Sequence, residues 1–207
     1  MPPPLGRESP AVVLVGYSGH AWVVAESALR AGIRLRGYCD RASKAANPYG
    51  LTWFGDEQTA ARDPSLAGSG WFVAIGDNAV RKRVMQSLEH VTSTNVRIVD
   101  PSTSLSAHAG LADGVFISAR AVLNSGSRIG RGVIINTGAI VEHECLIGDF
   151  AHIAPGTILT GNVQVGEGAF VGAGAVVRPG IRIGAWARIG CGAVVVKDVP
   201  ADTIVYG

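Results

Sequence analysis

The sequence predicts an α/β region built on a small parallel sheet, followed by an all-β region wound as a parallel β-helix. Two observations carry this prediction. The second half has an aliphatic residue at every sixth position, and the first hundred residues alternate short apolar runs with amphipathic stretches. The glycine content supports both observations, because 28 of 207 residues are glycine, well above the usual share of ~7%. With 47% hydrophobic residues, this indicates regularly spaced turns between short strands.

The six-residue repeat runs in phase from residue 105 to residue 195. Its aliphatic positions are Leu105, Leu111, Ile117, Leu123, Ile129, Ile135, Val141, Ile147, Ile153, Leu159, Val165, Val171, Val177, Ile183, Ile189 and Val195. A period of six fits neither an α-helix of period 3.6 nor a plain strand of period 2. Three hexads make one triangular coil with the aliphatic side chains inside. Residues 105–200 therefore predict about five coils, stacked at the strand spacing of ~4.8 Å.

The first hundred residues read as strands alternating with helices. Apolar runs predict strands, and amphipathic stretches predict helices up to Arg30 and over 79–89. The expected strands are 11–15, 33–38, 71–75 and 96–99. This pattern predicts a Rossmann-like parallel sheet with its ligand at the carboxyl ends of the strands. The turn Gly16–His20 would offer free N–H groups to a nucleotide diphosphate, although a tight turn that simply needs glycine is the alternative.

Composition excludes several classes of protein. The net charge is +2 with 16% charged residues and no basic stripe, which argues against a nucleic-acid partner. Three widely spaced cysteines, Cys39, Cys145 and Cys191, indicate a reducing compartment rather than a disulfide framework. No apolar run approaches the ~18–20 residues of a membrane span, and the Pro-rich first ten residues lack the apolar core of a signal peptide. We therefore expect a cytoplasmic protein without a membrane partner.

Among the histidines, His143 stands out because Glu142 and Glu144 flank it on a stretch with few charges. A histidine oriented by a carboxylate is a competent general base near neutral pH; a polar rim residue is the alternative. His152 follows half a coil later, so the two imidazoles should lie on different faces of one prism. They can share a pocket only if copies pack side by side, which predicts a site between subunits; a trimer would have three equivalent grooves of this kind. For His152 an exposed corner position is the alternative.

The other histidines and the cysteines have simpler readings. His90 should be a solvated residue at a helix end, and His108 an exposed edge residue. Some prisms of this shape bind zinc between subunits through three histidines. The spacing of those histidines differs from the gaps of 35 and 9 residues between His108, His143 and His152, so we expect no metal. Cys145 occupies an inward slot and should be a core residue. No cysteine has a histidine beside it in the sequence, and we expect no cysteine nucleophile.

Three blocks together resemble the NeuD/PglD-like sugar acetyltransferases of the hexapeptide-repeat acyltransferase superfamily. They are Gly16–His20, Gly76–Arg81 and Ile135–Ile153, and the resemblance extends over residues 11–207. It implies a left-handed β-helix, a homotrimer and acetyl-CoA as co-substrate. Members N-acetylate nucleotide-linked 4-amino-4,6-dideoxy sugars or O-acetylate sialic acid. The implied organisation is a disordered arm over 1–10, a Rossmann-like sugar-nucleotide-binding domain over 11–100 and a β-helix acyltransferase domain over 101–207.

The resemblance also implies roles for single residues. His143 would take a proton from the sugar amine, with Glu144 as its orienting partner, during direct attack in a ternary complex. Backbone N–H groups would stabilise the oxyanion. The residues implied to bind the nucleotide sugar are Gly16, Ser18, Gly19, His20, Asp40 and Asn136. Those implied to bind acetyl-CoA are His152, Gly161, Gly190, Cys191 and Gly192.

The chain departs from this family at three places. Arg41 follows Asp40 where many relatives have a second acidic residue, so the preference for base or sugar should differ. Asp100 stands in place of a common histidine, which should affect only packing. The sequence given ends at Gly207, where relatives continue with a Gly-x-Pro-Ala tail, so contacts to the adenine end of CoA should differ.

An N-acetyltransferase for a UDP-, dTDP- or GDP-linked amino sugar is the first hypothesis. An O-acetyltransferase for sialic acid is the alternative, and a non-catalytic binding module is the second alternative. A nicotinamide-dependent reductase is disfavoured, because Gly16-x-x-Gly19 is not the full G-x-G-x-x-G fingerprint. The nucleotide, the sugar stereochemistry and the acyl chain length stay open.

Overall fold

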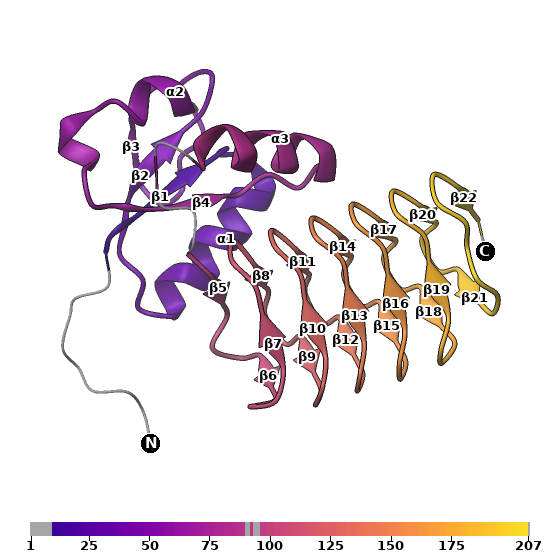
Figure 1. The fold of residues 1–207 in the computed structure, drawn as a ribbon. Helices are drawn as coiled ribbons and strands as arrows, with labels where there is room; N and C mark the ends of the chain where they lie inside the picture. Colours follow the sequence, from indigo (N-terminus) through magenta and orange to yellow (C-terminus); the bar gives the residue numbers. More distant parts are fainter. Residues whose placement is uncertain (1–9, 90–91, 93–95, 207) are drawn as a thin grey trace.

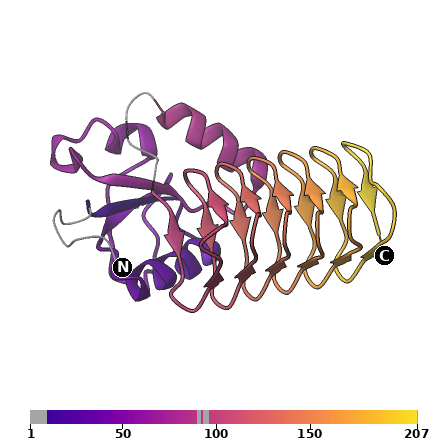
Figure 2. The ribbon, with the colours of Figure 1, turned by 60° about the horizontal axis from the view of Figure 1, so that its bottom comes forward.

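The computed structural model describes residues 10–89, 92 and 96–206 (Figure 1). A small α/β part lies against one end of a long three-sided prism, and the coils of the prism follow one another in a row (Figure 2). Most of the arm expected over 1–10, and His90, lie outside the described residues. No helix among the described residues is long and apolar enough to cross a membrane.

The α/β part contains a four-stranded parallel sheet of order β3-β2-β1-β4. Its strands are β1 (Val12–Val15), β2 (Leu35–Cys39), β3 (Thr52–Trp53) and β4 (Gly70–Val73). Its helices are α1 (Gly19–Arg30), α2 (Glu57–Ala60), the 3-10 turn η1 (Pro64–Leu66) and α3 (Asn78–Leu88). The sequence predicted β1, β2, β4, α1 and α3. It missed β3, α2 and η1, which are too short to show a periodic pattern.

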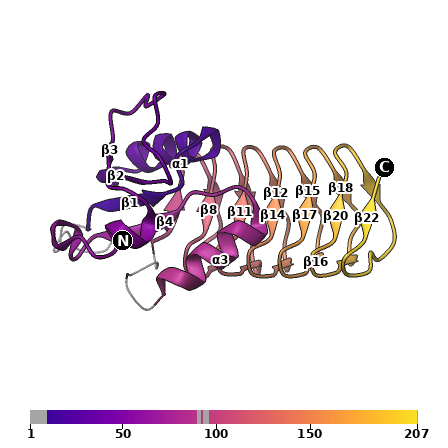
Figure 3. The ribbon, with the colours of Figure 1, turned by 90° about the horizontal axis from the view of Figure 1, so that it is seen from above.

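Helices α1 and α3 cover opposite faces of this sheet (Figure 3). Alternate residues of a strand point to opposite faces. Val12 and Leu14 accordingly pack in the cluster that contains α1 residues, whereas Val13 and Val15 pack with α3 residues. The sheet is thus buried on both sides, as expected for a parallel sheet.

The prism has three parallel sheets of two-residue strands, and each strand pairs with the strand one coil further along the chain. The docked face contains β5 (Ile98–Val99), β8 (Phe116–Ile117), β11 (Ile134–Ile135), β14 (His152–Ile153), β17 (Phe170–Val171), β20 (Arg188–Ile189) and β22 (Ile204–Val205). The apolar face contains β6 (Ser104–Leu105), β9 (Val122–Leu123), β12 (Ile140–Val141), β15 (Ile158–Leu159), β18 (Val176–Val177) and β21 (Val194–Val195). The arginine face contains β7 (Gly110–Leu111), β10 (Arg128–Ile129), β13 (Leu146–Ile147), β16 (Gln164–Val165) and β19 (Arg182–Ile183).

The second residue of each strand is the hexad position, and these side chains fill the prism. Ile117 through Val195 form one buried cluster, which confirms the predicted repeat. Leu105, at the open first coil, is 40% exposed because no earlier coil covers it. The prism is also taller than expected, because strands before residue 105 and after residue 200 extend it at both ends.

One expected strand belongs to a different sheet. Residues 96–99 were expected to close the N-terminal sheet, but β5 pairs with β8 of the prism. Ile98 lies one coil before Phe116 in the ladder, so this segment is already the first strand of the docked face. Asp100, just after it, is 1% exposed and pairs with Arg30 of α1 at 3.5 Å. Asp100 therefore links the start of the prism to α1 through an ion pair. That this position affects only packing stays a prediction.

The docked face takes its name from the α/β part that covers it. The outward residues of its first strands, Ile98, Phe116 and Ile134, are at most 2% exposed and share one core with α1. Further along the face the outward residues change to His152, Phe170 and Arg188, of which Arg188 is exposed. The apolar cover by α1 ends before His152, but contacts of α3 continue further: Asn78 donates to the Gly168 carbonyl at 3.0 Å, and Lys82 lies 5.5 Å from the centroid of the Trp186 ring.

Candidate active site

A cavity of about 520 Å³ lies at the carboxyl ends of β1, β2 and β4. Gly16, Ser18, Asp40, Gly76 and Asp77 are among its lining residues. This is the position that the strand order predicts for a ligand in a parallel α/β sheet. Three of the six residues implied to bind a nucleotide sugar therefore line one cavity.

In the turn after β1, the backbone of Gly16 lies close to the side chain of Ile75. Gly16 has φ +85°, and a Cβ there would lie 2.7 Å from Cγ1 of Ile75, so only glycine fits without strain. Ser18 precedes α1 but makes no capping hydrogen bond, which leaves the first N–H groups of this helix without a side-chain acceptor. Such groups suit a phosphate. Asp40 accepts a hydrogen bond from the Tyr17 N–H at 2.9 Å and pairs with Lys44 at 2.9 Å.

Gly19 and His20 are the first residues of α1, and His20 points toward the prism rather than lining the cavity. Its ring lies edge-on to Phe116, with centroids 5.7 Å apart, and 6.3 Å from the ring of His152. Burial and, to a lesser extent, the nearby charge of Arg81 together lower the pKa of His20 to about 4. The imidazole is therefore neutral at pH 7.

His152 is 8% exposed and lies at the junction of the two parts. Its Nδ1 is 3.4 Å from the Gly76 carbonyl, and its Nε2 is 3.1 Å from Nδ2 of Asn136. Burial, followed by the charges of Arg81 and His20, lowers its pKa to about 3. The structure thus brings His152, implied to bind acetyl-CoA, together with His20 and Asn136, which are implied to bind the nucleotide sugar.

Arg81 holds this junction together, and the sequence analysis assigned it no role. It is 1% exposed, and its guanidinium donates to the carbonyls of Ile75, Gly76, Gly132 and Phe150 at 2.7–3.0 Å. The first two carbonyls belong to the α/β part and the last two to the prism. Burial lowers the pKa of Arg81 to about 9, which leaves it charged at pH 7.

One sequence signal could have identified Arg81. It lies on the inward side of α3 with Asn78, Val84, Met85 and Leu88, all of them buried. An arginine on the buried stripe of an amphipathic helix needs several acceptors in the interior. Two of these acceptors, the carbonyls of Gly132 and Phe150, lie far away in the sequence, so only the tertiary structure identifies them.

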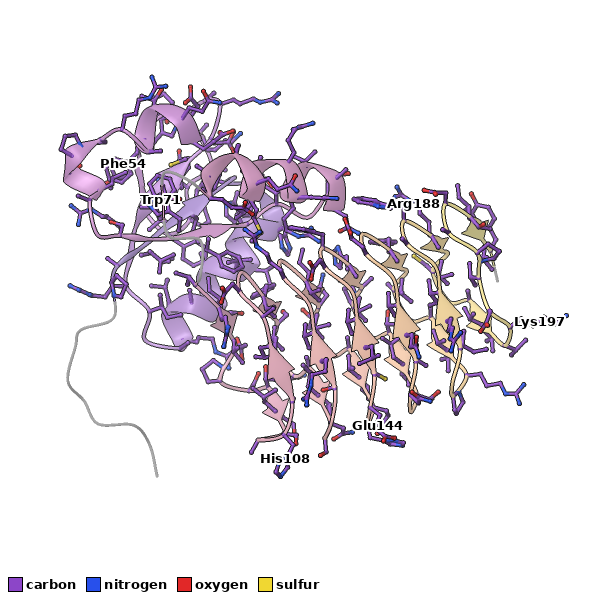
Figure 4. All side chains as sticks on the ribbon, viewed as in Figure 1. Phe54, Trp71, His108, Glu144, Arg188 and Lys197 are labelled. Atoms are coloured by element: carbon purple, nitrogen blue, oxygen red, sulfur yellow. The ribbon has the colours of Figure 1, made fainter. Side chains whose placement is uncertain are left out.

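His143 lies elsewhere, at the corner between β12 of the apolar face and β13 of the arginine face. Its side chain is 61% exposed, and Nδ1 is 3.3 Å from Oε2 of Glu144. In Figure 4, Glu144 lies on the side of the prism away from α3. Glu142 does not contact His143 but accepts a hydrogen bond from Asn124 at 2.9 Å. The expectation that His143 and His152 lie on different faces of one prism is confirmed.

Two edges border the apolar face. We call the corner that holds His143 and Gly161 the histidine edge; a Cβ on Gly161 would lie 2.5 Å from Cε1 and Nε2 of His143. The opposite corner, between the docked and apolar faces, holds Asn136 and Gly190–Gly192, and we call it the glycine edge. The residues implied to bind acetyl-CoA are therefore divided: Gly161 lies beside the base, and His152 and Gly190–Gly192 lie near the other edge.

The cysteines have the predicted surroundings. Cys145 is 0% exposed inside the prism and Cys39 is buried at the end of β2, whereas Cys191 is exposed on the glycine edge. Burial raises the pKa of the Cys145 thiol and raises that of Cys39 to about 12, which opposes formation of a thiolate. Within the described part of the chain, no three His, Cys, Asp or Glu side chains are placed to hold a metal ion.

Family models match both parts of the chain. The PglD N-terminal domain matches residues 11–88, and the bacterial transferase hexapeptide (six repeats) matches residues 162–197. No curated protein sequence matched the chain.

Solved structures match nearly the whole chain. PerB from Caulobacter crescentus, in complex with CoA and GDP-perosamine, is 38% identical with a TM-score of 0.90, over 95% of this chain and 94% of that chain. The acetyltransferase domain of PglB from Neisseria gonorrhoeae, in complex with acetyl coenzyme A, is 30% identical with a TM-score of 0.90, over 96% and 97% of the two chains. WeeI from Acinetobacter baumannii, at 24% identity and a TM-score of 0.87, shares the fold.

These matches agree with the geometry. A parallel α/β sheet with a cavity at its carboxyl ends precedes a prism that, as predicted, is a left-handed β-helix. One family model covers most of the α/β part and the other covers residues 162–197 of the prism, and the relatives that are at least 30% identical cover both parts together. The chain belongs to the PglD-like sugar acetyltransferases of the hexapeptide-repeat acyltransferase superfamily.

Proposed function

We propose that this protein transfers the acetyl group of acetyl-CoA to the amino group of a nucleotide-linked 4-amino-4,6-dideoxy sugar. The Caulobacter relative was crystallised with CoA and GDP-perosamine, and the Neisseria relative with acetyl coenzyme A. In the same proposal, residues 11–100 bind the nucleotide sugar in the cavity of the α/β part, and residues 101–207 carry out acyl transfer. We place the reaction in the cytoplasm.

The apolar face carries this proposal, because it explains how the divided site residues meet. Its outward residues are apolar in five successive coils, and Val194 is 67% exposed. They are Val122, Ile140, Ile158, Val176 and Val194. Among the described residues no helix covers this face, whereas the docked face is covered and the arginine face carries Arg128 and Arg182. A continuous apolar stripe of this kind favours self-association.

Three copies that pack their apolar faces around a threefold axis form a homotrimer. In such a trimer the histidine edge of each copy lies beside the glycine edge of the next. His143 then faces the glycine edge near Asn136 across the seam, with His20 and the nucleotide cavity behind it, and Gly190–Gly192 lie three coils further along the same edge. Three equivalent active sites result, one at each seam.

The chemistry follows from these positions. The neutral sugar amine attacks the thioester carbonyl, and Nε2 of His143 takes the proton that the nitrogen loses. Glu144 accepts a hydrogen bond from Nδ1–H and keeps Nε2 unprotonated for this step. Backbone N–H groups along the glycine edge stabilise the oxyanion. The C–S bond then breaks, and the CoA thiolate takes the proton from His143, so that no acyl-enzyme forms.

Release of free CoA with a panel of amino acceptors tests the proposal. The panel contains GDP-perosamine, UDP- and dTDP-linked 4-amino sugars, and sialic acid. We expect CoA release with at least one nucleotide amino sugar. Release with sialic acid alone would favour the O-acetyltransferase alternative, and no release with any acceptor would favour the binding module.

Replacing the base tests the mechanism. His143→Gln should lower kcat about 10²–10⁴-fold, the usual contribution of a general base. His108 is a matched control because it is an exposed histidine on the same edge, two coils earlier. His108→Gln should leave kcat unchanged. Near wild-type turnover by His143→Gln would contradict the assignment of the base.

A further inference from the structure

The cavity of the α/β part has two ends, which the order of the strands defines. Its turn Gly16–Ser18 follows β1, and β1 lies between β2 and β4 in the sheet. Gly76, after β4, lines the cavity, and Arg81 joins its carbonyl to that of Gly132 in the prism. The β4 end therefore adjoins the part to which we assign acyl transfer. A sugar amine must point toward this end, so the nucleoside belongs at the β2 end.

Asp40 follows β2 and marks the place of the ribose. Parallel sheets of this kind bind the ribose at an acidic residue after the second strand. Oδ2 of Asp40 accepts from the Tyr17 N–H and Oδ1 pairs with Lys44, both at 2.9 Å. A carboxylate has about four acceptor positions, so Asp40 can still accept from a ribose hydroxyl. The base then lies beyond Asp40.

Two charged side chains line the cavity at this end. Arg41 is the next residue along the chain, and Glu57 is the first residue of α2. Helix α2 follows β3, which pairs with β2, so both side chains come from the same side of the cavity. Arg41 is exposed, Glu57 is half-buried, and neither side chain has a hydrogen bond or an ion pair with another described residue. The β2 end thus offers a ligand one free cation and one free carboxylate.

These two groups match the hydrogen-bonding pattern of one nucleobase. A guanidinium only donates and a carboxylate only accepts. Guanine has acceptors at O6 and N7, which an arginine contacts together, and adjacent donors at N1 and the N2 amino group, which can pair with both oxygens of a carboxylate. Uracil and thymine have a single N–H between two carbonyls, and adenine and cytosine have an acceptor at the central position. None of these four bases offers two adjacent N–H donors to a carboxylate.

We propose that Arg41 and Glu57 select guanine, so that the substrate is a GDP-linked amino sugar. Arg41 donates to O6 and N7, and Glu57 accepts from N1–H and the N2 amino group. Arg41 stands where many relatives have an acidic residue, and it supplies the donor that O6 requires. The inference rests on the proposed function for the sugar and for acyl transfer, whereas selection of the base can be measured without either.

Binding of nucleoside diphosphates to the whole chain tests the proposal. Isothermal titration calorimetry compares GDP, inosine diphosphate, ADP, UDP, dTDP and CDP in the absence of acetyl-CoA. We expect GDP to bind most tightly. Inosine diphosphate lacks the N2 amino group and should bind about 10–100-fold more weakly, the usual effect of one hydrogen bond to a charged group. UDP, dTDP, CDP or ADP binding as tightly as GDP, or no binding of any nucleotide, would overturn the proposal.

Replacing the carboxylate by an amide tests Glu57. Glu57→Gln keeps the size of the side chain but cannot accept from both donors, so GDP should lose its advantage over inosine diphosphate. Xanthosine diphosphate has a carbonyl in place of the N2 amino group and should bind Glu57→Gln more tightly than wild type, because the amide donates to this carbonyl. A structural role for Glu57 would not produce this gain. An unchanged ratio of GDP to inosine diphosphate affinity would contradict the assignment.

Arg41 is tested through the bases that carry O6. Arg41→Ala should weaken GDP and inosine diphosphate alike, by about 10–100-fold, and should not weaken ADP, which has an amino group in place of O6. An equal loss for all the nucleotides would indicate contact with the phosphates and would overturn the assignment. Arg62→Ala is the matched control, because Arg62 is an exposed arginine of the α/β part that does not line this cavity, and every affinity should be unchanged.

Thermal melting identifies any variant that fails to fold, and the order of affinities of the wild-type protein decides the base in that case. Guanine selection without acetyl transfer to any sugar would contradict the proposed function alone. Acetyl transfer without guanine selection would contradict this inference alone.

Discussion

The replacement Gly161→Ala tests the position of His143 without changing any reacting group. A Cβ at residue 161 would lie 2.5 Å from Cε1 and Nε2 of His143 and 3.3 Å from Nδ1. Non-bonded carbon atoms normally stay about 3.5–4.0 Å apart. The ring must therefore move by about 1 Å or more.

Stability should hardly change in this variant. The His143 side chain is 61% exposed, so the ring can turn into solvent without disturbing the core. The backbone of Gly161 is not in the left-handed region, so alanine fits it without strain. We expect the free energy of unfolding to stay within about 0.5 kcal/mol of wild type.

Activity should fall sharply for the same reason. A displacement of about 1 Å in a reacting group can cost about 100-fold in rate. We expect kcat for acetyl transfer, measured by CoA release at saturating substrates, to drop by about this factor while the melting temperature is retained. Gly110→Ala is the matched control: its Cβ would meet Cδ of Arg128 at 3.0 Å on the arginine face, and kcat should not change.

Two results would refute this reasoning. Wild-type kcat in Gly161→Ala would show that the position of His143 does not matter for the reaction. An increase only in the KM for acetyl-CoA would show that Gly161 contacts the coenzyme, as the family resemblance implies, and that the imidazole is not crowded as the structure has it.

Three further predictions concern the junction and the apolar face. Arg81→Met should lower the free energy of unfolding by about 3–5 kcal/mol in urea denaturation, because the buried carbonyls lose their donor; a loss below 1 kcal/mol would contradict this account. Ile158→Glu should convert the proposed trimer to monomers in size-exclusion chromatography with light scattering, whereas Gln164→Glu on the arginine face should not; a trimeric Ile158→Glu variant would exclude the apolar face as the interface. The pKa values of His20 and His152 are lowered in the folded protein to about 4 and about 3 from 6.5, so the unfolded chain takes up protons first as the pH falls. Stability should be full above about pH 6.5 and decline from there toward pH 4, by on the order of 3 kcal/mol per histidine, and a flat urea midpoint over this range would show that these histidines are not buried as neutral groups.

The prism could be predicted from the sequence because its six-residue repeat is a short-range pattern along the chain. Each coil repeats the same three hexads, and the ladder partner of a residue is always one coil away, so Ile135 and Ile153 fall into register once the period is known. His143 is likewise a sequence neighbour of both Glu142 and Glu144; this adjacency predicted an orienting carboxylate, the family resemblance implied Glu144, and the structure places Glu144 beside the ring. The cavity of the α/β part followed from the rule that parallel strands end at the same edge.

The junction could not be read in this way. His20, Arg81, Asn136 and His152 come from separate segments and meet only because α1 and the loop before α3 pack on the docked face. The strand at Ile98 also could not be assigned from the sequence. Its apolar run suits the N-terminal sheet and the prism equally well, and only its pairing with Phe116 places it in the prism. Repetition along the chain thus determined the prism and one edge of the site. Contacts between distant segments, which no local pattern encodes, decided how its histidines are buried, protonated and held.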